Sequence, residues 1–398
     1  MLKRFYVDNF KTHINTTYDA GPVNLLVGMN NSGKTNLCQA MRFVGATSVQ
    51  SLSQAAILAA SEEWSLTNVY LKKSTIDFRV EAELDYEGSV FSFVYELTVK
   101  VLPTAAVKDA GSRLAVQREV LVVSGGGFNN TVLIQNEAGQ ARLLHETRKS
   151  LGGAEQYVAT NAPVDATMLS RLYDLKDNPR ANLFKKYMSS WIYYDLDTLQ
   201  LRKAEAKILE TVLAVDGSNL ASVLFNLKNG NERLYRKLID ITRNAIDSRL
   251  ELLSFFSPAE NQVFMFGEDA AGNRFGPWSM SNGTLRFLAL GYLFLTPNNY
   301  LGIGGSRLVI IEEPETGIYA GHLKELFGLI DRSGANGQFM FTTHAPYFID
   351  LFDDLLEGIT ITRPGEKNTQ LVRPDANKLR TQLESMPLGE LHFREMLG

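Results

Sequence analysis

The sequence has few of the features that secreted and membrane proteins depend on. It contains one cysteine, Cys38, which excludes an intrachain disulfide framework and a multi-cysteine zinc site. No apolar core follows the charged residues Lys3 and Arg4, so we predict no signal peptide. The longest apolar run, residues 287–295, is much shorter than the ~20 residues that cross a bilayer. We therefore expect a cytoplasmic protein with no membrane partner.

A basic excess is also missing. The chain carries 40 Lys and Arg against 44 Asp and Glu, a net charge of −4. Nucleic-acid-binding proteins usually show a basic surplus, so DNA binding would require a local patch. One stretch with helical spacing offers modest basic candidates: Arg233, Arg236, Lys237, Arg243 and Arg249. The same charges fit the solvated face of a helix, and the sequence leaves both readings open.

Hydrophobic periodicity divides the 398 residues into four parts. Residues 2–7 and 23–27 favour strands, and a helix should begin at Lys34. Residues 75–84, 90–101, 119–123 and 131–135 alternate with the period of antiparallel strands. Spacing is helical from 165 to 250, and helices and strands alternate near the C-terminus. We predict one compact unit: a nucleotide core split between 1–50 and 260–398, an antiparallel β subdomain at 65–140, and a helical insert at 165–250.

A phosphate-binding loop is the strongest local signal. Residues 28–35, Gly-Met-Asn-Asn-Ser-Gly-Lys-Thr, match G-x-x-x-x-G-K-[ST] between an apolar strand and a helix, as this motif requires. Backbone amides and the helix N-terminus would surround the phosphates, with Lys34 on the β- and γ-phosphates and Thr35 on Mg²⁺. A tight turn with no role in phosphate binding would not need to lie between an apolar strand and a helix. The predicted nucleotide-binding residues here are Gly28, Asn30, Asn31, Ser32, Gly33, Lys34, Thr35 and Asn36.

Acidic residues end a second apolar strand. Residues 307–311 are followed by Glu312, Glu313, Pro314 and Glu315. Ligands bind at the carboxyl ends of strands in open α/β sheets. We expect Glu312 to hold Mg²⁺ and Glu313 to act as general base on water. These acids could instead simply end the strand in solvent, but the phosphate loop favours the catalytic interpretation. Because 313 − 34 = 279 residues separate Glu313 from Lys34, a large insert must split the core.

Four further segments occur in an order that resembles a known class. Residues 8–11 (Asp-Asn-Phe-Lys), 279–286 (Ser-Met-Ser-Asn-Gly-Thr-Leu-Arg) and 341–346 (Phe-Thr-Thr-His-Ala-Pro) are similar to the N-terminal, signature and switch-histidine motifs of RecF/SMC/ABC-class P-loop ATPases. Residues 216–221 (Asp-Gly-Ser-Asn-Leu-Ala) also resemble a segment of these proteins. The greatest likeness is to the overcoming-lysogenization-defect-like AAA family, found in bacterial anti-phage defence systems.

The resemblance implies an α/β fold, an ABC/SMC-type ATPase head with a mixed sheet, an antiparallel β subdomain and a helical insert. It also implies ATP and Mg²⁺ as cofactors and a homodimer or higher homo-oligomer joined through the shared ATP site. Ser281 and Gly283 would then reach the γ-phosphate bound to the opposite protomer, and His344 would contact that phosphate or the attacking water. Taken alone, Ser281 is an ordinary helix N-cap and His344 could be structural.

Some positions depart from the pattern. Asn282 stands where transporters carry glycine, and Tyr319 stands where the family often has histidine. The glutamine of the usual Q-loop has no identifiable position. No Asn-Lys-x-Asp motif is present, because Leu379 and Arg380 follow Asn377-Lys378, so ATP is favoured over GTP.

The sequence supports two functions. Too few residues follow His344 for a TOPRIM nuclease domain, and no HNH-like cluster occurs among the five histidines, so we expect no nuclease activity from this chain. The favoured function is an ATP-hydrolysing oligomeric switch, scaffold or sensor that serves a separate effector protein in anti-phage defence. The alternative is a DNA-repair-type ATPase that cycles on DNA.

Overall fold

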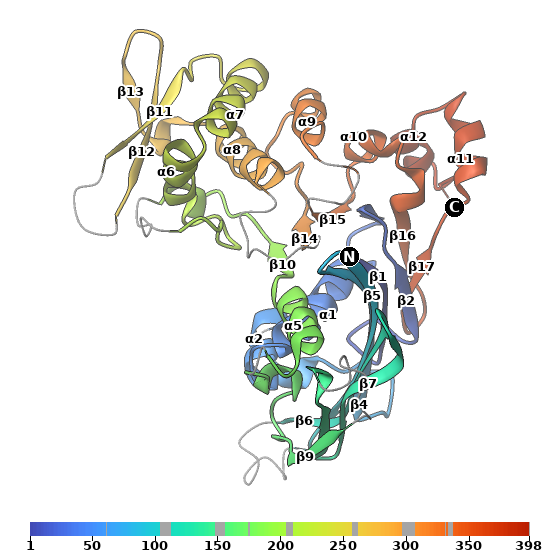
Figure 1. Cartoon of the computed structure of the whole chain (residues 1–398). Helices are drawn as coiled ribbons and strands as arrows, with labels where there is room; N and C mark the ends of the chain where they lie inside the picture. The colour runs from blue at the N-terminus through green and yellow to red at the C-terminus, as the bar shows by residue number, and fades with distance from the viewer. Residues whose placement is uncertain are drawn as a thin grey trace.

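A computed structural model describes residues 1–60, 62–103, 113–147, 156–173, 176–203, 210–256, 262–296, 307–330, 332 and 337–397. In Figure 1 a central sheet separates a lower lobe rich in strands from an upper lobe that is mainly helical. No helix within the described ranges could cross a membrane.

The central sheet joins the two ends of the chain. Its six strands run in the order β10, β14, β15, β3, β16, β17; the first five are parallel and β17 is antiparallel. Val23 in β3 pairs with Phe339 in β15, so residues from the two ends of the chain lie side by side in this sheet, which is mixed as predicted. The strands are β3 (Val23–Val27), β10 (Ile192–Tyr194), β14 (Leu308–Glu312), β15 (Gln338–Thr343), β16 (Ile359–Pro364) and β17 (Thr369–Val372).

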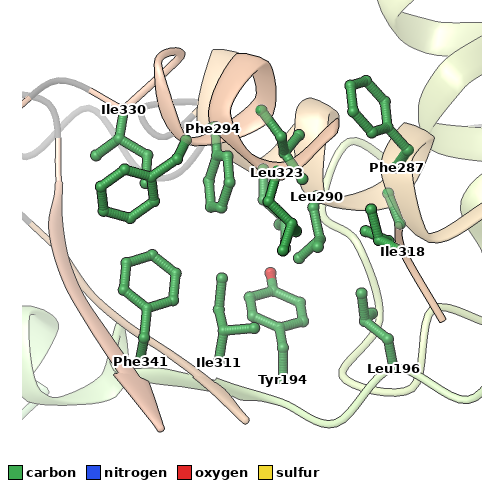
Figure 2. Packing of buried hydrophobic residues seen from close by; sticks show 14 of the residues in the cluster. Tyr194, Leu196, Phe287, Leu290, Phe294, Ile311, Ile318, Leu323, Ile330 and Phe341 are labelled. Atoms are coloured by element: carbon green, nitrogen blue, oxygen red, sulfur yellow. The ribbon is translucent and has the colours of Figure 1, made fainter. Parts of the chain in front are cut away.

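Alternate residues of these strands enter two different cores. In β14, Ile311 packs with the helices above the sheet, whereas Ile310 faces the lower lobe. A strand buried on both faces favours apolar residues at every position, which explains the apolar run at residues 308–311 of β14. The one polar residue of β3, Asn24, is buried and donates to the carbonyls of Gly21 at 2.7 Å and Phe339 at 2.9 Å. Figure 2 shows the upper core, where Tyr194, Ile311 and Phe341 point toward side chains such as Leu290, Phe294 and Leu323. The covering helices are α8 (Asn282–Leu295), α9 (Ala320–Phe327) and α10 (Pro346–Ile349).

The lower lobe is a curved antiparallel sheet of eight strands in the order β2, β1, β4, β5, β6, β7, β8, β9. Two-residue turns connect β4 to β5, β6 to β7 and β7 to β8, and both central residues of each turn have positive φ. This geometry is that of type I′ hairpins, which suits Glu87-Gly88, Gly126-Gly127 and Ala138-Gly139. The strands are β1 (Leu2–Asp8), β2 (Thr16–Asp19), β4 (Thr75–Tyr86), β5 (Ser89–Val101), β6 (Leu114–Gly125), β7 (Phe128–Glu137), β8 (Gln140–Leu144) and β9 (Tyr157–Asn161).

Helices complete the two lobes and the C-terminal edge. The lower core contains α1 (Lys34–Thr47), α2 (Leu52–Ala60) and α5 (Pro179–Ser189). The upper lobe adds α6 (Leu220–Gly230), α7 (Glu232–Ala245), β11 (Leu252–Phe256), β12 (Phe264–Glu268) and β13 (Arg274–Phe275). At the C-terminus, α11 (Ala376–Leu383) and α12 (Leu388–Phe393) lie beside α10 and β16 (Figure 1).

One expectation needs correction. Residues 165–250 do not lie wholly outside the core, because β10, which falls within this range, pairs with β14 in the central sheet. A strand of three residues, Ile-Tyr-Tyr, is too short to interrupt the helical periodicity around it. The sequence left two readings open for the basic stretch at 233–249. Arg236 and Arg243 of α7, and Arg249 after it, pair with Glu232, Asp240 and Asp247 at 2.6, 2.8 and 2.9 Å, which favours the solvated helix face.

A buried carboxylate ties the β sheet to the segment that leads into α5. Glu119 on β6 is fully buried and accepts hydrogen bonds from the backbone amides of Met168 (2.6 Å) and Leu169 (3.0 Å) and from the hydroxyl of Tyr95 (3.1 Å). Burial raises the pKa of Glu119 to about 7. These three donors have no access to water, so they depend on this one side chain.

We predict that Glu119→Ala lowers the free energy of unfolding by about 2–4 kcal/mol, because it leaves buried donors unsatisfied. Glu83→Ala is a matched control, since Glu83 is a half-exposed β4 residue paired with Lys3 at 2.8 Å, and it should cost less than about 1 kcal/mol. Urea unfolding followed by intrinsic fluorescence measures both. Equal losses in the two variants would show that Glu119 does not anchor this junction.

Candidate functional site

The phosphate loop turns from β3 into α1 through two residues with left-handed backbone. Asn31 has a φ of 64° and Gly33 a φ of 101°. Asparagine and glycine are the residue types that adopt this conformation most readily. A Cβ at Gly33 would also lie 2.0 Å from Thr369 Oγ1 on β17. No side chain caps α1, so its first backbone amides remain directed into the loop.

Neighbouring elements hold the loop in place. Ser32 and Thr362 on β16 share a hydrogen bond of 2.6 Å between their hydroxyls, and a Cβ at Gly28 would lie 2.3 Å from Thr362 Oγ1. His13 Nε2 donates to the carbonyl of Gly33 at 3.1 Å. Burial lowers the pKa of His13 to about 4, so the ring is neutral at physiological pH. On the exposed side, Asn36 Nδ2 donates to Thr12 Oγ1 at 2.9 Å.

Lys34 lies beneath the loop with 7% of its surface exposed. Its Nζ donates to the carbonyls of Gly28 at 2.5 Å and Met29 at 3.0 Å. Burial lowers its pKa, whereas the nearby carboxylates of Glu313 and Glu312 act in the opposite direction. A buried cation beside uncapped amides is suited to attract an anion.

Glu312 supplies a carboxylate next to the start of α1. It ends β14, and its side chain lies close to the hydroxyls of Tyr193 and Thr35. Burial raises its pKa, and its Oε1 atom is buried without a hydrogen-bond partner. An unpartnered carboxylate oxygen beside a threonine hydroxyl fits Mg²⁺, which prefers oxygen ligands. Within the described ranges no group of three His, Cys, Asp or Glu side chains could hold a metal, so Mg²⁺ would need ligands from nucleotide and water.

Glu313 and His344 form a pair at the same edge. Glu313 follows β14 with a φ of 40°, a strained conformation for a residue other than glycine, and its amide donates to the carbonyl of Thr342 at 3.1 Å. His344 follows β15, and its Nδ1 lies 3.0 Å from Glu313 Oε1. Both side chains are partly exposed, at 39% and 49%. The pair therefore faces the open side of the loop, where a water molecule can reach it.

Sequence reasoning assigned no role to Glu315, which connects the two strands behind this pair. It is 3% exposed and accepts a hydrogen bond from the Thr343 hydroxyl. That hydroxyl accepts in turn from the amide of Ala345 at 2.9 Å. Burial raises the pKa of Glu315. Its place in the Glu-Glu-Pro-Glu run was a usable signal, since a third acid so near the strand end seldom lies in a core by chance.

Asp195 was also missed. It follows β10, which lies beside β14, so its charge is near Glu312 and contributes to the raised pKa of that residue. The signal was an aromatic and β-branched run, Ile192-Tyr193-Tyr194, that ends in an acid.

The signature segment lies apart from the phosphate loop. Ser281 caps α8, with its Oγ accepting from the Thr284 amide at 2.9 Å, as predicted. Ser281 and Asn282 are exposed, and Gly283 packs against the segment after β14, where a Cβ would lie 2.8 Å from the Gly317 carbonyl. Among the described residues no hydrogen bond joins 281–283 to 28–36. The structure thus brings Lys34, Thr35, Glu312, Glu313 and His344 together. It leaves Ser281 exposed at the start of α8, with Gly283 buried directly behind it.

A recess of about 340 Å³ continues from the loop toward the lower lobe. Lys11, Thr12 and Asn31 line one side, and the β16–β17 turn with Lys367 lines the other. Val69 and Tyr70 are exposed at 87% and 62%, and both belong to the lining. Asn68 joins the two walls by donating to the carbonyls of Lys11 at 2.6 Å and Lys367 at 3.1 Å.

The fold is similar to that of solved structures. The crystal structure of an SMC head bound to the C-winged helix domain of ScpA has a TM-score of 0.53 and 14% identity, over 96% of this chain and 99% of that chain. Two further SMC heads are similar at lower scores. One, derived from Pyrococcus furiosus, has a TM-score of 0.48 and 14% identity over 96% and 98% of the chains. The other, from Thermotoga maritima, has a TM-score of 0.41 and 12% identity over 94% and 99%.

No curated protein matches the chain. A family model described as "AAA domain, putative AbiEii toxin, Type IV TA system" matches residues 143–350, which is just over half of the 398 residues. The matched range contains the signature, the β14 acids and His344. The chain therefore belongs to this AAA family and has the fold of an SMC/ABC-class P-loop ATPase head.

Proposed function

We propose that the protein binds and hydrolyses ATP with Mg²⁺ at a site completed by a second copy of the chain. The observation that carries this proposal is the separation of two half-sites. The phosphate loop, Glu312, Glu313 and His344 form one half, and the exposed N-terminus of α8 at Ser281 forms the other. Because a helix N-terminus favours an anion, two copies related by a two-fold axis would complete two sites at once.

Within one half-site each residue has a distinct task. The loop amides and Lys34 would bind the phosphates, with Lys34 Nζ exchanging the carbonyls of Gly28 and Met29 for phosphate oxygens. Thr35 and Glu312 would hold Mg²⁺, which when bound neutralises charge that develops on the phosphates. Glu313 would take the proton of the attacking water, and His344 would orient that carboxylate. The Ser281 hydroxyl and the α8 amides of the second copy would stabilise the γ-phosphate.

The recess beside the loop supports a nucleotide rather than a smaller phosphate ligand. Its volume of about 340 Å³ and its position next to Asn31 suit the ribose and base. Tyr70 offers an aromatic face for the base, and Lys11 adds positive charge near the phosphates. We propose that this recess orients the adenosine.

At the level of the cell, we propose an oligomeric switch or scaffold that serves a separate effector in anti-phage defence. The family's description names a toxin of a toxin–antitoxin system, which supports a two-component arrangement. The upper lobe of α6, α7 and β11–β13 projects away from the central sheet (Figure 1) and is our candidate surface for the effector. DNA cycling is less well supported, since arginines of the α7 stretch are ion-paired.

Removing the charge of Lys34 should prevent nucleotide binding. We predict that Lys34→Ala lowers ATP·Mg²⁺ affinity by more than about 30-fold, the typical effect of losing one partner of a buried charged contact. Lys324→Ala, on the exposed face of α9, should leave affinity unchanged. Isothermal titration calorimetry decides this, and equal affinity in Lys34→Ala and wild type would contradict the assignment of the loop.

Hydrolysis and assembly should separate in two further variants. Glu313→Gln should slow hydrolysis by about 10²–10⁴-fold while ATP still binds, so an ATP-bound dimer or a larger assembly accumulates. Ser281→Arg should block that assembly without weakening ATP binding to one protomer. Ser189→Arg, on the exposed end of α5, serves as control. Light scattering with and without ATP measures the assembly. A Glu313→Gln protein whose size ignores ATP, together with a fully active Ser281→Arg, would mean that one chain holds the whole site.

A further inference from the structure

A short segment after β10 is bound to the signature through two arginines. The segment, residues 195–202, runs from Asp195, beside the metal-site acid Glu312, to η4 (Gln200–Arg202). Its backbone is fixed by hydrogen bonds from the amides of Asp195 and Asp197 to the carbonyls of Val215 (3.0 Å) and Asp216 (3.1 Å). Leu196 and Leu201 anchor it in the upper core. The segment is therefore a rigid bridge between the β14 acids and the upper lobe.

Arg202 forms hydrogen bonds with residues on both sides of Ser281. Its guanidinium donates to the carbonyls of Pro277 and Met280, the latter at 3.0 Å, and to Asn282 Oδ1 at 2.5 Å. Trp278 lies over the same guanidinium, with its ring centre 5.6 Å from the Arg202 Cζ atom. A planar fork of donors suits several acceptors at fixed angles, and lysine cannot reproduce it. Arg202 thus fixes the backbone immediately before the exposed serine and the side chain of the residue immediately after it.

Arg286 makes the contact in the opposite direction. It belongs to the first turns of α8, is 9% exposed, and donates to the carbonyl of Leu196 within the bridging segment. Arg202 of the bridging segment therefore hydrogen-bonds to residues at the start of α8, and Arg286 of α8 hydrogen-bonds back to the bridging segment. Two reciprocal links of this kind fix both the position and the rotation of the α8 N-terminus.

We propose that Arg202 is a positioning residue for the ATP bound to the second copy of the chain. By fixing the backbone around Ser281, it keeps the α8 N-terminus ready for the γ-phosphate held by that copy. This inference rests on the proposed composite site. It assigns to Arg202 an effect in trans. When Arg202 is replaced, the nucleotide pocket of the same chain stays intact, but the nucleotide pocket of the second copy loses the signature residues that complete it.

Arg202→Ala should leave ATP affinity of single protomers within about twofold of wild type and lower kcat by about 10²-fold, as expected when positioning groups are lost. Arg202→Lys retains the charge without the fork, so its kcat should be intermediate at an unchanged KM. Arg236→Ala, which removes an exposed α7 arginine paired with Glu232, is the matched control and should hydrolyse ATP normally. ATP binding also reports whether each variant is folded. If Arg202→Ala fails to fold, Arg202→Lys replaces it in the mixing experiment below.

Mixing two inactive variants separates a trans effect from a general loss of structure. Arg202→Ala mixed with Lys34→Ala forms one whole site, from the phosphate loop of the first and the signature of the second. The mixture should regain roughly a quarter of the wild-type rate, since half of the dimers are mixed and one of their two sites is whole. Arg202→Ala mixed with Ser281→Arg should regain nothing, because both defects lie on the signature side.

Normal hydrolysis by Arg202→Ala, or no recovery with Lys34→Ala, would overturn the role of Arg202. The mixture of Lys34→Ala with Ser281→Arg shows which idea has failed. If that mixture recovers activity and the Arg202→Ala mixture does not, the composite site stands and only the role of Arg202 is wrong. If neither mixture recovers, the proposed composite site itself is wrong.

Discussion

Parallel pairing of β3 with β15, and of β15 with β14, is the constraint on which the site depends. Strand β3 lies near the N-terminus and strands β14 and β15 lie near the C-terminus, yet the three strands pair side by side. Their carboxyl ends therefore lie at the same edge of the sheet. That edge places the phosphate loop after β3 next to Glu312 after β14 and His344 after β15. The eight-stranded sheet and the upper lobe pack on opposite faces of the central sheet and bury its strands on both faces.

The same constraint explains why the proposed site needs a second copy of the chain. The helix α8 covers the upper face of the sheet, so its N-terminus is held by Gly317 and Arg202 and not by the phosphate loop. The exposed N-terminus of α8 is suited to an anion presented by another molecule, and in the proposed dimer the nucleotide on the phosphate loop of an identical chain would present one.

Much of this could be predicted from the sequence, because the informative signals are local. The phosphate loop, the β14 acids and the Ser281 cap each depend on residues within a few positions of one another. The long strands β4 and β5 were equally clear, since their alternation extends over many residues. What was missed depends on contacts between distant residues. Strand β10 is too short to show a period, Asp195 gains meaning only beside Glu312, and no local pattern marks Glu119 or Arg202 as partners of segments 49 and 75 to 80 residues away.

The central claim is that the phosphate loop of one chain meets the signature of another. It can be tested with chains that carry one exposed cysteine each, since the only native cysteine, Cys38, is buried. Met29→Cys places a thiol on the exposed tip of the loop, and Ser279→Cys places one at the start of the signature segment. Treated with a short bismaleimide, an equimolar mixture of the two chains should form a covalent dimer when ATP is present, and far less when ATP is omitted or either chain is alone. Failure of the mixture to cross-link, although both chains bind ATP, would contradict the account.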